Sequence, residues 1–169
     1  SLEHDIMKHN PNVDLEALIA YGKERNVGII LWSSWMALTK NTAGIFKNYA
    51  DLGIKGFKVD FLGRDDAKMV NSVYDIAQKA VDHKLLLDFH GMYKPTGIQR
   101  TFPNILNFEG VKGLENNKWT PNDDVPLYDT TIPFIRMMAG PMDYTPGAMR
   151  NATKIEFKPS HSNPVSQGT

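Results

Sequence analysis

Several residue types and patterns are missing from this 169-residue sequence, and each absence narrows the range of functions. It has no cysteine, which excludes a disulfide scaffold, a thiolate metal site and a cysteine nucleophile. Nineteen basic residues balance nineteen acidic ones, so the basic excess that is typical of nucleic-acid-binding proteins is absent. No apolar run approaches the ~20 residues that a transmembrane helix needs. We therefore expect a globular protein with neither nucleic-acid nor membrane partners.

Familiar cofactor motifs are missing as well. No glycine-rich GxGxxG or GxxxxGK[ST] turn follows an apolar run, so nothing marks a nucleotide-binding loop. Neither HxH nor HExxH occurs among the five histidines, which argues against a histidine zinc site.

What the sequence does contain is an alternation of helical and strand patterns. The predicted helices cover residues 14–25, 45–52, 65–83 and 130–138, and the predicted strands cover residues 28–32, 55–61, 85–89 and 105–108. Such alternation favours a parallel sheet with helical crossovers. A doubly wound sheet would usually show a glycine-rich nucleotide turn, whereas a complete (β/α)8 barrel needs about 250 residues. We therefore predict an α/β fold, a (β/α)8 TIM barrel of which this chain supplies only part.

Polar residues follow every predicted strand. Trp32 and two serines end the first strand, Asp60 the second, Asp88 and His90 the third, and Glu109 the fourth. Because substrates bind at the carboxyl ends of parallel strands, these side chains are expected to converge on one rim.

Two carboxylates on that rim suit glycosidic bond cleavage, which needs a nucleophile or base and a carboxylic acid. Asp60 has its geometry fixed by the end of a buried strand, as a nucleophile requires. Glu115, on a loop after another strand, could approach the opposite side of the scissile bond. The alternative is that Asp60 caps the following helix and Glu115 is a solvated loop residue.

Other side chains near these carboxylates have two interpretations each. Lys58 shares a strand face with Asp60, so it could stabilise the charge of Asp60 and contact a sugar hydroxyl, or form a Schiff base as in aldolase-type barrels. His90 could bind substrate or be structural, and Trp32 could stack on a sugar ring or pack in the core. Glu109 and Glu115 offer the hard oxygens that suit calcium.

Five segments of the sequence resemble glycoside hydrolase family 97, which comprises α-glucoside and α-galactoside hydrolases found mainly in gut Bacteroidetes. These segments are GIKGFKVDF (53–61), DFHG (88–91), KPTGIQRTFPN (94–104), NFEGVKGLE (107–115) and IPFIRMMAGPMDYTPG (132–147). The resemblance implies that residues 1–169 are a single segment of the family's (β/α)8 catalytic domain, without its flanking β-sandwich and C-terminal β-domain. It also implies a periplasmic or otherwise exported protein.

The resemblance further implies a retaining mechanism. Inverting members carry a base glutamate after the histidine of the fifth-strand motif, where this sequence has Gly91. Retaining members, whose known activity is α-galactosidase, carry a nucleophilic aspartate that matches Asp60. Glu115 matches the general acid/base, and Glu109 matches a ligand of the family's calcium ion.

The expected function is therefore cleavage of terminal α-galactosides through a covalent galactosyl–aspartate intermediate. Lys58, His90 and Trp32 are expected to bind the substrate, and Glu109 and Glu115 the calcium ion. The alternatives are an α-glucosidase of the same family and a catalytically inert barrel fragment. The open edges of such a partial barrel favour a homo-oligomer.

Overall fold

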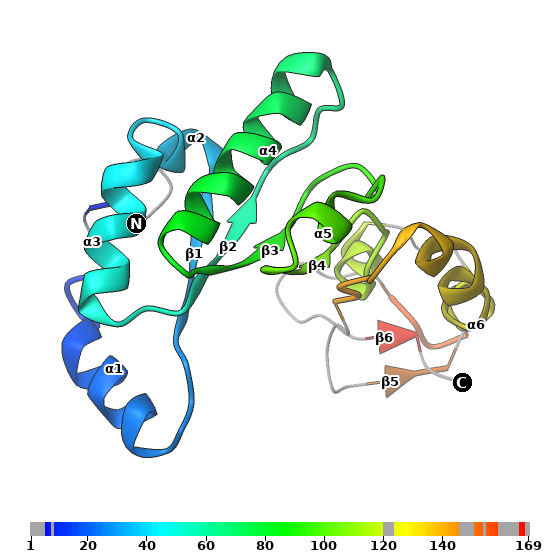
Figure 1. The fold of residues 1–169 in the computed structure, drawn as a ribbon. Coiled ribbons are helices and arrows are strands. Elements are labelled where there is room, and N and C mark those ends of the chain that lie inside the picture. The colour runs from blue at the N-terminus through cyan, green and yellow to red at the C-terminus, as the bar shows by residue number, and fades with distance from the viewer. Residues whose placement is uncertain are drawn as a thin grey trace.

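Four parallel strands form the main sheet of the computed structural model, which describes residues 6–7, 9–119, 124–145, 151–153, 155–158 and 166–167. The strands lie side by side in chain order: β1 (Ile30–Ser34), β2 (Gly56–Asp60), β3 (Leu86–Phe89) and β4 (Ile105–Phe108) (Figure 1). This order and direction confirm the predicted parallel sheet.

Helices connect the strands and continue beyond them. They are α1 (Leu15–Glu24), α2 (Trp35–Leu38), α3 (Thr42–Leu52), α4 (Ala67–Asp82), α5 (Ile98–Thr101) and α6 (Val125–Arg136), with 3-10 turns η1 (Leu114–Lys118) and η2 (Met137–Ala139). A second, two-stranded sheet pairs β5 (Asn151–Ala152) with β6 (Ser166–Gln167). Within the described part of the chain, no helix has both the length and the apolar character to cross a membrane.

Short polar residues decide where the helices begin and end. The side chain of Asp14 accepts a hydrogen bond from the backbone of α1, and Asp66 accepts two at the start of α4. Gly53 ends α3 in a left-handed conformation with φ of 104°. Because Asp66 caps α4, the alternative role of Asp60 as the cap of that helix is wrong.

One face of the sheet packs on helices. Phe57 on β2 contacts two aromatic rings of α3, with centroid distances of 5.3 Å to Phe46 and 5.6 Å to Tyr49. Phe57 and Val59 are fully buried on this face, and the hydrophobic core continues under α4, which crosses the sheet on the same side (Figure 1). Alternate residues therefore point to the opposite face.

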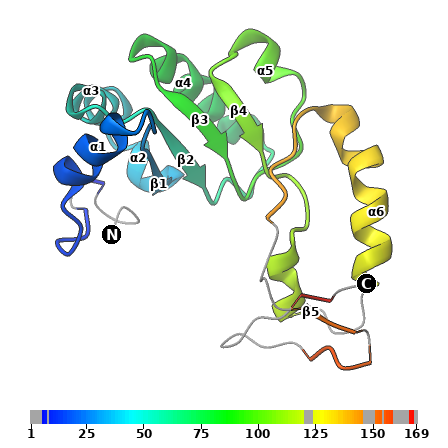
Figure 2. The ribbon, with the colours of Figure 1, turned by 90° about the horizontal axis from the view of Figure 1, so that it is seen from below.

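That opposite face carries the polar residues of the strands. Trp32, Lys58, Asp88 and Asn107 lie in register across all four strands and form one layer. In a complete barrel this face would be the interior. Beyond β4, α6 lies apart from the sheet (Figure 2). The predicted turn at Pro146–Gly147 lies outside the described residues.

Candidate active site

Asp60 ends β2 with both carboxylate oxygens held by N–H donors. The indole Nε1 of Trp32 on β1 donates to Oδ2 at 3.0 Å, and the backbone N–H of Phe61 donates to Oδ1 at 2.6 Å. The two aromatic rings meet edge to face with their centroids 5.7 Å apart. Hydrogen bonds to an ionised acceptor are stronger than neutral ones, so this half-buried carboxylate has a fixed orientation.

Backbone strain contributes to this arrangement. Phe61 has a φ of 68°, in the left-handed region that bulky residues rarely adopt, and its side chain is 52% exposed. Such a conformation costs about 1–3 kcal/mol and tends to occur at functional sites. Here the left-handed turn coincides with the hydrogen bond from the N–H of Phe61 to the side chain of the preceding residue.

His90, at the end of β3, is buried among three carboxylates. Its Nε2 hydrogen-bonds with Asp143 and lies 3.5 Å from Oδ2 of Asp88, while its Nδ1 lies 3.7 Å from Oε2 of Glu109. Asp143 is brought here because its backbone N–H donates to the carbonyl of Phe108 at 2.8 Å, at the end of β4. The histidine therefore links the ends of two strands to a segment that follows α6.

The carboxyl groups of Asp88 and Asp143 differ in pKa. Burial raises the pKa of Asp88 to about 6, and the neighbouring Asp143 carboxyl adds to the rise, against the opposing effect of His90 and Lys58. Burial also acts to raise the pKa of Asp143, but hydrogen bonds with His90 and Asp88 outweigh it and lower that pKa. Of these two carboxyls, Asp88 therefore keeps its proton to a higher pH than Asp143 does.

The same group could hold a metal ion. One ligand atom from each of Asp88, His90 and Asp143 lies within 4.8 Å of the other two. Oδ1 of Asp88 is buried without a hydrogen-bond partner, so this oxygen is available to a cation. With one imidazole nitrogen, however, the set is less suited to calcium, which prefers oxygen ligands.

The two predicted calcium ligands differ in their relation to that group. Oε2 of Glu109 accepts a hydrogen bond from the backbone N–H of Gly91 at 2.6 Å, so this side chain faces His90 from β4. Glu115 lies on η1 with an exposed side chain. The described contacts therefore connect Glu109, Gly91 and His90, whereas the roles of Glu115 stay predictions.

Lys58 sits in the middle of the polar layer. It is half-buried between Trp32 and Asp88 in the strand register, and its positive charge lowers the pKa of both Asp88 and Asp143. The sequence predicted that Lys58 would act on Asp60. The electrostatic effects that the structure shows fall on the carboxyls near His90.

Arg136, which was not among the predicted site residues, supports this rim from α6. Its buried guanidinium donates to five backbone carbonyls at 3.0–3.2 Å: Phe108, Glu109 and Gly110 after β4, and Gly140 and Pro141 after η2. A single side chain thus joins the strand that carries Glu109 to the segment that carries Asp143. An arginine inside the apolar stretch Ile-Pro-Phe-Ile-Arg-Met-Met was the signal available in the sequence.

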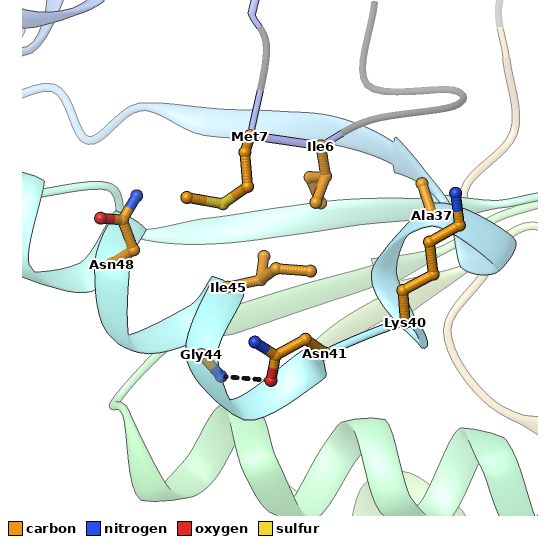
Figure 3. Close-up of a pocket in the computed structure, with 8 residues that line it drawn as sticks. All are labelled: Ile6, Met7, Ala37, Lys40, Asn41, Gly44, Ile45 and Asn48. Carbon is orange, nitrogen blue, oxygen red and sulfur yellow. Dashed lines mark hydrogen bonds between the residues drawn. The ribbon is translucent and has the colours of Figure 1, made fainter.

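Two cavities differ in their position relative to this site. One of about 320 Å³ borders Gly91 and is lined by Gly63, Arg64, Asp65, Met92 and Tyr93, from the loops after β2 and β3. Another, of about 620 Å³, lies between Ile6, Met7 and the α2–α3 region and includes none of the rim residues (Figure 3). The first cavity is the one placed beside the predicted chemistry.

Known proteins resemble this chain in sequence. A retaining alpha-galactosidase of Bacteroides thetaiotaomicron is 49% identical over 170 residues, which cover 100% of this chain and 26% of that protein. A probable retaining alpha-galactosidase of Streptomyces bingchenggensis is 36% identical over 135 residues, covering 78% of this chain and 20% of the relative. The chain therefore spans at most about a quarter of the length of these curated relatives.

Solved structures share the fold. A glycoside hydrolase family 97 enzyme from Pseudoalteromonas sp. strain K8, in complex with acarbose, superposes with a TM-score of 0.71 at 29% identity, covering 83% of this chain and 24% of that one. A beta-arabinopyranosidase superposes with a TM-score of 0.73 at 27% identity, covering 92% and 27%. The predicted partial TIM barrel is thereby confirmed. Since the sequence profile of glycoside hydrolase 97 matches residues 1–111, the chain belongs to glycoside hydrolase family 97.

Proposed function

We propose that this chain carries the catalytic centre of a retaining α-galactosidase, with Asp60 as nucleophile and Glu115 as general acid/base. The observation that carries the proposal is the carboxylate of Asp60, oriented by two N–H donors at the carboxyl end of β2. Both curated relatives bear this activity in their names. Gly91 supports the same branch, because the carboxylate base of an inverting enzyme is absent there.

The reaction is a double displacement. Asp60 forms a bond to the anomeric carbon as the glycosidic C–O bond breaks, and Glu115 gives its proton to the departing oxygen. Glu115 then takes a proton from water, whose oxygen replaces Asp60 at the anomeric carbon. Trp32 and the Phe61 N–H hold the attacking carboxylate in one orientation throughout. Fixed orientation of this kind lowers the barrier because the carboxylate need not reorganise.

The substrate is a terminal α-galactoside, bound by polar side chains of the inner sheet face. Lys58, half-buried two residues before Asp60 on β2, can hydrogen-bond a sugar hydroxyl, whereas the buried His90 would act on the substrate through the carboxylates around it. We assign part of the leaving group to the cavity of about 320 Å³ next to Gly91. An α-glucoside of the same size differs in the direction of one hydroxyl, so the two substrates must be compared directly.

A calcium ion, bound through Glu109 and Glu115, belongs to the same proposal. Its support is the cluster of carboxylates around His90, which Glu109 joins with its Oε2 3.7 Å from Nδ1 of that histidine, while the part of Glu115 rests on the family resemblance. When bound, calcium would supply positive charge that stabilises negative charge developing on nearby oxygens. The protein groups alone already orient the nucleophile.

The test uses a chimera, because the chain matches only a quarter of the Bacteroides relative. Residues 1–169 replace the matching segment of that relative, and turnover of nitrophenyl α-galactoside and α-glucoside is measured. We expect activity on the galactoside, and a loss of at least about 1,000-fold in Asp60→Asn, since no nucleophile remains. Asp60→Gly with added azide should recover part of the activity.

Mass spectrometry supplies a second readout. A fluorinated galactosyl inactivator should add covalently to the peptide that contains Asp60, provided that circular dichroism shows a folded chimera. Preference for the glucoside would replace the substrate assignment, while a folded but inactive and unlabelled chimera would contradict the enzymatic role. Asp75→Asn, which changes an exposed aspartate on α4, is the matched control and should keep activity.

A further inference from the structure

Gly91 stands against the carboxylate of Asp60 from the neighbouring strand. It follows His90 after β3, and its φ of 55° lies in the left-handed region. A Cβ atom at this position would lie 2.9 Å from Oδ1 of Asp60, closer than such atoms approach in real proteins. It would also meet the backbone of Phe61, 3.1 Å from N and 3.2 Å from Cα.

The backbone at this point has little freedom to move away. The N–H of Gly91 donates to Oε2 of Glu109 at 2.6 Å. The adjacent His90 N–H donates to the carbonyl of Val59 at 2.8 Å, which ties β3 to β2 directly beside Asp60. The group that can yield is therefore the Asp60 side chain. By moving, its carboxylate would lose the geometry of its bonds to Trp32 and Phe61.

We propose that Gly91 is a positioning residue for Asp60. The carboxylate keeps its orientation because no side chain at position 91 fills the space beside it. A side chain at 91, including a carboxylate base, and an oriented aspartate at 60 then exclude each other. In this barrel the choice between retention and inversion is therefore steric as well as chemical. The catalytic consequence rests on the proposed function, whereas the steric relation does not.

The steric relation is tested on the 169-residue chain without any activity. Gly91→Ala is compared with Gly97→Ala, because Gly97 also has a positive φ, of 105°, but a Cβ there would meet nothing within 4 Å. The indole N–H resonance of Trp32 reports its hydrogen bond to Asp60. We expect Gly91→Ala to move that resonance and Gly97→Ala to leave it in place. Equal spectra for the two variants would overturn the inference.

A double-mutant cycle covers the case in which Gly91→Ala unfolds the chain. Both alanine variants lose stability through their left-handed backbone, but only Gly91→Ala adds the collision with Asp60. In an Asp60→Gly background this additional loss should shrink, and in an Asp75→Asn background, which changes an exposed residue of α4, it should persist. An additional loss that is the same in both backgrounds would contradict a role directed at Asp60.

Activity then separates this inference from the proposed function. In the chimera, Gly91→Ala should lower kcat about 100-fold with a smaller change in KM, because a misplaced nucleophile slows chemistry more than binding. Gly97→Ala should stay near the parent value. A moved Trp32 resonance with an inactive parent chimera would contradict the function and leave the steric relation standing. Full activity in Gly91→Ala would overturn the positioning role.

Discussion

The orientation of Asp60 depends on residues that are distant in the sequence. Trp32 is 28 positions away, and its indole reaches the carboxylate because β1 pairs with β2. The sequence could place Asp60 at the end of a strand, since a short apolar run precedes it. It could not decide between a helix cap and a catalytic carboxylate. The structure excludes the cap, because Asp66 accepts both capping hydrogen bonds of α4. The catalytic role of Asp60 stays a prediction.

Glu109 gives the residue-scale prediction. Its carboxylate faces the His90 group, and Glu109→Gln keeps its size and an oxygen that can accept from Gly91 while removing the charge. We expect the chimera to lose about 10–100-fold in calcium affinity, measured by titration calorimetry, because the charge of the proposed ligand is lost.

The matched control for that titration is Glu16→Gln, a change of an exposed glutamate on α1. It should bind calcium like the parent chimera. Calcium binding that is unchanged in Glu109→Gln, or absent from the folded parent, would remove Glu109 from the proposed metal site.

At the scale of elements, sequence patterns predicted the long helices and the strands. They did not predict how Arg136 joins the end of β4 to the segment that follows α6. The helix expected at residues 130–138 begins earlier, at Val125, because Asp124 caps it and Pro126 is tolerated in its first turn. Arg136 at its end fits the usual preference for a basic residue at a helix C-terminus. Its actual partners include carbonyls 26–28 positions earlier, which no local pattern reveals.

Arg136→Lys tests how strongly that arginine holds β4 to the segment with Asp143. Lysine keeps the charge but cannot donate from several nitrogens in a fixed plane, so most of the five hydrogen bonds should be lost. We expect the free energy of unfolding in urea to fall by about 2–4 kcal/mol.

Arg100→Lys, on exposed α5, makes the same chemical change at the surface and should stay within about 0.5 kcal/mol of the parent. Equal stability of the two variants would show that the hydrogen bonds of Arg136 contribute little. Faster hydrogen exchange at the amide of Asp143, which bonds to β4, would locate the loss in Arg136→Lys.

At the scale of the whole molecule, alternation along the sequence predicted the fold class because each buried strand reads as an apolar run between amphipathic helices. Short elements such as α2, α5 and η1 have too few residues to show a period, so they were not predicted. Asp143 was missed for another reason. Its place beside His90 depends on the path of the chain after α6, and no strand pattern precedes it.

The outer strands of the sheet lead to the last prediction, which concerns association of the 169-residue chain. In the four-stranded sheet, β1 and β4 are the outer strands, and each exposes an apolar side chain: Ile30 is 43% and Leu106 is 49% exposed. Unpaired edges and uncovered apolar side chains favour pairing with another copy.

We expect light scattering to show concentration-dependent association, and Leu106→Lys to weaken it by at least about tenfold, because an interface would bury the new charge. Leu127→Lys on α6, where leucine is 64% exposed, should associate like the parent. If the parent chain remains monomeric at every concentration, then the edges of this sheet do not drive assembly, and the inner face is stable in water because of its polar layer.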